Sequence, residues 1–126
     1  PITGAGFGDY EKGVLDYKCL INPVADPVTG CGMNVAPNDV IFYSANSTGA
    51  QLAAFDKYGR EALQPWGYSP STNTFVTFDD KWSVQAKTQK VIDGKMGGTM
   101  FWELDGDSTD PAKSLVRATA AIFRGK

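Results

Sequence analysis

The chain has 126 residues, of which 42% are hydrophobic and 21% are charged, as is typical of one globular domain or a part of a larger one. It contains no histidine, which excludes Ser-His-Asp and Cys-His nucleophile systems and histidine-containing zinc sites. The net charge is −2 and there is no basic run, so nucleic acid is not an expected partner. No apolar stretch reaches the length of a membrane span, and we expect neither a membrane nor a metal or cofactor as a partner.

The N-terminal part is rich in turns. The sequence begins at Pro1 without an initiator methionine or a signal sequence, so we expect a chain that was processed or cut from a longer one. Residues 10–21 predict a short helix, because Val14, Tyr17 and Ile21 recur at helical spacing and Asp9 stands where an N-cap would lie.

The two cysteines, Cys19 and Cys31, flank a loop rich in proline and glycine. An even number of cysteines in a turn-rich chain favours one disulfide and a secreted, extracellular protein. Two unpaired buried thiols are the alternative. Residues 40–44 predict a short strand, and residues 53–80 predict an antiparallel meander with turns at 58–59 and 69–73.

The last third has a different pattern. Residues 81–95 predict a helix with Asp79, Asp80 and Ser83 as candidate N-caps. Residues 99–104 predict an apolar strand buried on both faces, and residues 112–123 a final helix with Pro111 at its first position. This strand–helix–strand–helix order predicts an α/β fold with a parallel sheet. Two strands cannot complete such a sheet, so we expect the chain to be incomplete.

Ligand groups in parallel α/β folds gather where strands end. Trp102, Glu103, Asp105 and Asp107 follow such an end. The pattern alone favours Trp102 as a core residue and the acids as a helix-entry loop, with a substrate platform as the alternative. The acidic run at residues 105–110 offers oxygen ligands for calcium but lacks EF-hand spacing.

Paired carboxylates would suit glycoside hydrolysis. The candidates Glu11, Glu61 and Glu103 lie on separate segments, and no spacing within the chain identifies an acid/base pair.

Four stretches of the sequence carry more information than the order of the predicted strands and helices. They are KMGGTMFWELDGD (95–107), YEKGVLDYK (10–18), WGYSP (66–70), and FDD (78–80) with SVQAK (83–87). The first resembles the last barrel strand of family 18 glycoside hydrolases, the chitinases. The second resembles the W-E-x-G-I-x-D-Y-R stretch of bacterial chitinase A-type enzymes, the third the segment returning from their insertion domain, and the fourth their F-D-D…S-V-x-x-K strand–helix entry.

The resemblance implies the C-terminal part of a (β/α)8 TIM barrel plus a small α+β chitinase insertion domain. Residues 1–68 would belong mostly to the insertion domain and residues 69–126 to the last strand and helix units of the barrel. It implies that Trp102 floors the subsite of the cleaved sugar and that Glu11 lies on the cleft wall. Tyr10 stands where a substrate-stacking tryptophan is common.

The family's catalytic signature D-x-x-D-x-D-x-E and its Met-x-Tyr motif are missing from the sequence, so we expect no catalytic residue in this chain. The implied parent is a secreted chitinase that cleaves β-1,4-linked N-acetylglucosamine polymers by a substrate-assisted retaining mechanism, and this chain alone would be inactive. The alternatives are a non-catalytic chitin- or carbohydrate-binding chitinase-like module and an interaction domain without a glycan role.

Two kinds of partner follow from these interpretations. One is chitin or a chitooligosaccharide. The other is the missing N-terminal half of the barrel or a second copy, because the lone chain would expose Met100, Trp102 and Leu104.

Overall fold

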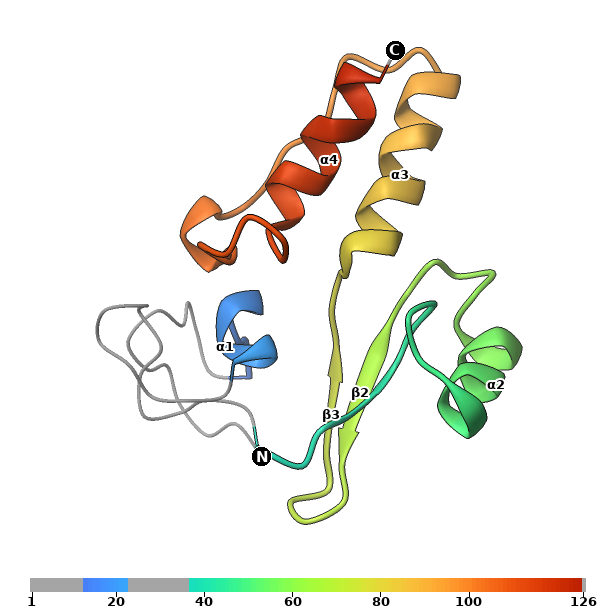
Figure 1. Ribbon diagram of the computed structural model, residues 1–126, viewed down its shortest axis with the longest axis vertical. Helices are drawn as coiled ribbons and strands as arrows, with labels where there is room; N and C mark the ends of the chain where they lie inside the picture. The colour runs from blue at the N-terminus through green and yellow to red at the C-terminus, as the bar shows by residue number, and fades with distance from the viewer. Residues whose placement is uncertain (1–12, 23–36, 126) are drawn as a thin grey trace.

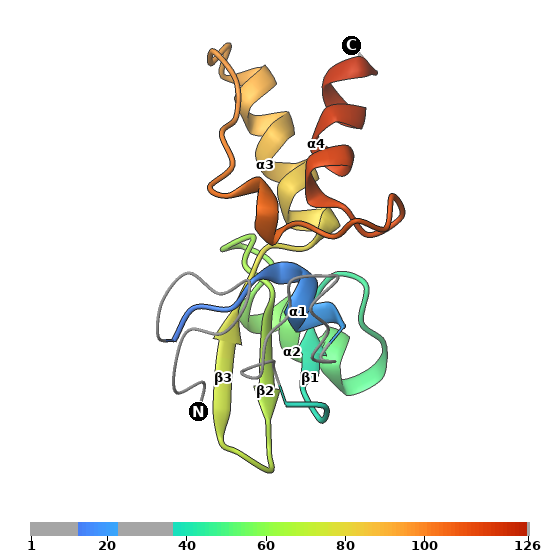
Figure 2. The same cartoon turned by 90° about the vertical axis from the view of Figure 1, so that its left-hand side faces the viewer.

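A computed structural model describes residues 13–22 and 37–125. In chain order, these residues form α1 (Tyr17–Ile21), β1 (Ile41–Tyr43), α2 (Gly49–Tyr58), β2 (Trp66–Ser69), β3 (Thr74–Thr77), α3 (Lys81–Asp93), the short 3-10 helix η1 (Leu104–Gly106) and α4 (Leu115–Arg124). Helices α1 and α2 lie on opposite sides of the sheet, and α3 and α4 lie side by side beyond one end of it (Figures 1 and 2).

The three strands form one antiparallel sheet in the order β1-β2-β3. Gly67, in the central strand, allows its neighbours to approach closely, because a Cβ atom there would lie 2.8 Å from Val40 Cγ1. On the other face of β2, Trp66 stacks on Tyr43 with ring centroids 3.7 Å apart and has Phe75 as its other aromatic neighbour. These cross-strand ring contacts help to fix the register of the short strands.

The expected strand at residues 40–44 and the turn at residues 69–73 are confirmed by β1 and the β2–β3 hairpin. The meander was wrong over residues 53–58, which belong to α2. Phe55 is the reason: it is completely buried in the helix and makes an edge-to-face contact with Trp82. Burial of this one ring against another helix outweighs the aromatic and turn signals that favoured a strand.

Of the three candidate N-caps of α3, the structure assigns Asp80, which forms a capping box with Ser83. Asp80 accepts from the backbone N–H of Ser83 at 2.8 Å, and Ser83 Oγ accepts from the N–H of Asp80 at 3.0 Å. Helices α3 and α4 pack through Val84, Leu115 and Ala118, which form the core cluster. Half-buried Tyr17 and Phe101 pack against this cluster, so α1 and the segment after α3 are both fastened to the helical pair.

Two helix boundaries differ from those predicted. Within the part of residues 10–21 that the structure describes, α1 begins only at Tyr17, because its N-cap Asp16 has a non-helical ψ of 140°. Gly13, with a φ of +86°, is also outside the helical region. The final helix begins at Leu115 and not at residue 112, because Ser114 is its N-cap and accepts from the backbone N–H of Arg117 at 3.0 Å.

Residues 99–104 do not form the predicted buried strand. Residues 99–103 form an irregular segment and Leu104 begins η1, and the side chains of Met100, Trp102 and Leu104 are 79%, 76% and 67% exposed. A strand needs a neighbour to share its backbone hydrogen bonds, and no described strand pairs with this segment. The predicted exposure of these three side chains is therefore confirmed, while the strand and its double-sided burial were wrong.

The α/β prediction needs the same correction. The described residues form a small α+β unit whose sheet is antiparallel, not a parallel strand–helix–strand arrangement. The (β/α)8 barrel and the division at residues 68 and 69 stay predictions. None of the helices in the described residues is long and apolar enough to span a membrane.

Candidate functional site

A cavity of about 270 Å³ lies where the segment before α1, the start of α4 and the loop after residue 100 meet. We call it the Trp102 pocket. It is lined by residues 14–17, Phe101–Glu103, Gly106, Asp107, Leu115 and Val116, with Asp79 and Val84 from the entry to α3. Three of the four stretches that carry the chitinase resemblance therefore contribute to one cavity. Their order along the chain did not reveal this meeting.

Trp102 is the large aromatic side chain at the rim of this pocket. Its side chain is exposed. Trp102 is therefore not a core residue of the described part of the chain. Neighbouring Phe101 also lines the pocket and packs against the core cluster. The peptide bond between Trp102 and Glu103 is cis. An exposed indole at a mostly apolar cavity that also holds carboxylates offers a flat apolar face to a ligand.

Asp107 also lines the pocket and caps the start of α4. Its carboxylate accepts from Ser114 Oγ at 2.6 Å and from the backbone N–H groups of Leu115 at 2.8 Å and Val116 at 3.2 Å. Burial acts to raise the pKa of Asp107, but these hydrogen bonds together outweigh it and hold the pKa below its ordinary value. For Asp107, the helix-entry interpretation is confirmed.

Tyr17 lines the pocket from α1. Burial, followed by the nearby charges of Asp80 and Asp107, raises the pKa of Tyr17 to about 12. Its hydroxyl therefore stays protonated at neutral pH and can donate a hydrogen bond. The pKa of Asp80 is also raised, chiefly by burial and to a smaller extent by the charge of Asp79. The capping hydrogen bonds lower this pKa but do not outweigh burial.

Lys18 holds the loop that follows Trp102. Its buried ammonium group donates to the backbone carbonyl of Asp105 at 2.6 Å and lies 3.4 Å from Asp16 Oδ2 and 3.7 Å from Asp105 Oδ2. Sequence reasoning missed this contact because the two residues are 87 positions apart. The only local signal was a charged pair, Asp16 and Lys18, within an otherwise apolar stretch.

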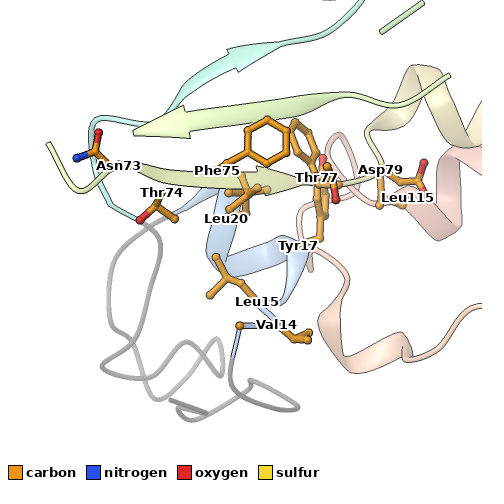
Figure 3. Close-up of a pocket in the computed structure, with 13 residues that line it drawn as sticks. Val14, Leu15, Tyr17, Leu20, Asn73, Thr74, Phe75, Thr77, Asp79 and Leu115 are labelled. Carbon is orange, nitrogen blue, oxygen red and sulfur yellow. The ribbon is translucent and has the colours of Figure 1, made fainter. Parts of the chain in front are cut away.

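A wider groove of about 700 Å³ adjoins the Trp102 pocket and shares Tyr17 and Asp79 with it. Figure 3 shows Leu15, Tyr17 and Leu20 on one side of this groove and β3 on the other. Phe75, on β3, is 61% exposed. The groove extends the Trp102 pocket along the sheet and gives it an apolar continuation.

Several predicted site residues fall elsewhere. Tyr10, Glu11 and Cys31 lie outside the described residues. Cys19 is completely buried and disulfide-bonded, whereas its pairing with Cys31 stays a prediction. Glu103 lines the Trp102 pocket and is exposed.

Glu61 is exposed in the turn after α2 and does not line this pocket. In residues 13–22 and 37–125, no cluster of three or more His, Cys, Asp or Glu side chains is arranged to hold a metal ion.

Residues 4–107 match the sequence model of glycosyl hydrolases family 18. The chain belongs to this family. The matched range includes every residue of the Trp102 pocket except those on α4, so the pocket is built mainly from family 18 sequence.

Named relatives of this family 18 chain are chitinases. "Chitinase A1" of Niallia circulans is 30% identical over 78 residues, which are 61% of this chain and 11% of that protein. "Chitinase" of Autographa californica nuclear polyhedrosis virus is 27% identical over 124 residues, 98% of this chain and 17% of that protein. "Chitinase 1" of Aphanocladium album is 28% identical over 103 residues, 82% of this chain and 18% of that protein. The chain thus spans less than a fifth of each relative.

Proposed function

We propose that this family 18 chain is part of a secreted chitinase that hydrolyses β-1,4-linked N-acetylglucosamine polymers. In this proposal the chain supplies substrate-binding residues. Trp102 lies at the subsite of the cleaved sugar, Glu11 lies on the cleft wall, and Tyr10 stands where a substrate-stacking tryptophan is common. The barrel's remaining strands and the general acid belong to another part of the protein. Residues 1–68 belong mostly to the insertion domain, and residues 69–126 to the last strand and helix units of the TIM barrel.

One observation carries the proposal. The exposed indole of Trp102 stands at a pocket built from three separate family 18 stretches. Their polar side chains at the pocket are Asp16, Tyr17, Asp79, Glu103 and Asp107. A pyranose ring has flat apolar faces and a polar rim. An aromatic platform beside carboxylates and a protonated phenol suits both features of such a ring.

The chemistry proposed for the whole protein is substrate-assisted. An acid donates a proton to the glycosidic oxygen while the carbonyl oxygen of the substrate's own acetamido group attacks the anomeric carbon and the bond to the leaving sugar breaks. Water then opens the cyclic intermediate, and the configuration is retained. This chain contributes the stacking surface, which orients the sugar for both steps. The disulfide bond at Cys19 supports secretion, since such bonds persist in oxidising compartments.

The test is to follow chitooligosaccharide hydrolysis by proton NMR with the complete protein and with the 126-residue chain alone. We expect the complete protein to release the β-anomer first and the isolated chain to show no turnover. Initial release of the α-anomer would overturn the retaining mechanism. Robust turnover by the isolated chain would overturn the division of labour between this chain and the rest of the protein.

The second candidate is a non-catalytic chitin-binding module, which the lack of D-x-x-D-x-D-x-E in this sequence favours. The same exposed aromatic side chain would then serve binding without chemistry. The sequence of the complete gene discriminates between the two. An upstream D-x-x-D-x-D-x-E in the same reading frame supports the enzyme, and its absence supports the module.

A further inference from the structure

The loop that carries Trp102 has an unusual anchor in the buried side chain of Lys18. Lysine is rarely buried unless its charge is paired. Here Nζ lies between the side chain of Asp16, which is 7% exposed, and the backbone carbonyl of Asp105. The ion pair with Asp16, the N-cap of α1, compensates the charge of Lys18. The hydrogen bond to Asp105 joins α1 to η1, three residues after Trp102.

We propose that Lys18 is a positioning residue that sets the orientation of Trp102 toward its ligand, an N-acetylglucosamine chain. The proposal rests on the function proposed above for Trp102. Lys18 does not line the Trp102 pocket, so it acts through the loop and not by contact with the sugar.

The need for such an anchor follows from the exposure of Trp102. A ring that is 76% exposed has few packing contacts of its own to hold it, so its direction depends on the backbone on either side. On the N-terminal side, Phe101 is fixed against the core cluster. On the C-terminal side, the Lys18 hydrogen bond fixes Asp105. Trp102 is thus held between two anchors, and a pre-set platform binds a sugar without first losing conformational freedom.

The contact between the two segments is also close. A Cβ atom placed on Gly106 would lie 3.3 Å from Asp16 Oδ1, so η1 lies directly against the segment that carries the ion pair. Stability alone is a weak reason for this arrangement, because a buried ion pair often stabilises no more than apolar side chains of the same volume. A lysine provides what an apolar side chain lacks, a directed hydrogen bond to a backbone carbonyl.

The experiment is a double-mutant cycle in the complete protein. Lys18→Met and Trp102→Ala are made singly and together, and kcat/KM on a chitooligosaccharide is measured with the free energy of unfolding. We expect Lys18→Met to lower kcat/KM about tenfold when Trp102 is present and less than about twofold when it is alanine, since coupled residues are not additive. Lys113→Met, which removes an exposed lysine paired with Asp110, is the control and should leave kcat/KM unchanged.

If Lys18→Met does not fold, Gly106→Ala replaces it in the same cycle, because the added methyl group disturbs the contact with Asp16 without removing a charge. Equal losses of kcat/KM in the two Trp102 backgrounds would overturn the positioning role while leaving the function of Trp102 intact. If Trp102→Ala alone leaves kcat/KM unchanged, the proposed function of Trp102 fails, and the role of Lys18 fails with it.

Discussion

The α3–α4 pair and the segment at residues 99–104 adjoin in the chain but differ in what determines their structure. Helix α3 carries its own start signal in the capping box of Asp80 and Ser83, and α4 carries one in Ser114. The apolar segment between them has no such local partners, because a strand obtains its hydrogen bonds from another strand. Local signals therefore yield a well-formed helix pair, whereas residues 99–103 form neither helix nor strand, and Met100, Trp102 and Leu104 are exposed.

A pair of leucines gives the sharpest contrast between the two regions. Leu115 is 8% exposed in the core cluster, whereas Leu104 is 67% exposed. Leu115→Ala should lower the free energy of unfolding by about 2–4 kcal/mol, since it leaves a cavity between the helices. Leu104→Ala should change it by less than about 0.5 kcal/mol. Chemical denaturation of both variants checks this, and equal losses would show that residues 99–104 are packed after all.

The cap of α4 should produce a pH-dependent effect of intermediate size. Asp107→Asn loses charge-assisted hydrogen bonds and should cost about 1–2 kcal/mol of unfolding free energy at pH 7. Since the folded pKa of Asp107 is lowered, its stabilisation is present above the ordinary aspartate pKa near 4 and is lost as pH falls through the lower folded value. Unfolding at several pH values should show the two proteins converging below about pH 4. A constant difference down to pH 3 would argue against the charged cap.

The smallest effect on stability is expected at Met100, where the change should be in association. The isolated chain exposes Met100 beside Trp102 and Leu104, and an apolar patch of this kind favours self-association. Met100→Lys should shift the chain toward monomer at tens of micromolar in sedimentation, with an unfolding free energy within about 0.5 kcal/mol of the parent. Tyr58→Lys, on exposed α2, is the matched control. A parent chain that is already a sharp monomer would contradict this prediction.

Much of the fold was predictable where the signal is local. The N-cap at Asp80, the start of α3 and the turn at residues 69–73 follow from residues within a few positions of one another. Asn73 has a φ of +51°, as its residue type favours in a turn. Helix α2 was missed because the burial of Phe55 against Trp82 depends on a residue in another helix.

The site shows the same division. The resemblance predicted that Trp102 faces a ligand, whereas the apolar pattern around it favoured a core position; the structure exposes its side chain. The contact between Lys18 and Asp105 was out of reach of sequence reasoning, because nothing at either position specifies a partner 87 residues away. Asp107 was recognised only as part of an acidic loop, since its capping role depends on where α4 begins.

Trp102→Ala in the complete protein tests the central claim most directly, with Trp82→Ala as its control. The account predicts that Trp102→Ala lowers transition-state stabilisation by about 1–3 kcal/mol, measured as kcat/KM, with a smaller loss of unfolding free energy. Trp82 packs edge-to-face on Phe55, so Trp82→Ala should do the reverse: about 2 kcal/mol of unfolding free energy lost and kcat/KM retained. A loss of about 3–5 kcal/mol in unfolding free energy for Trp102→Ala, with kcat/KM unchanged, would contradict the account and make Trp102 a structural residue.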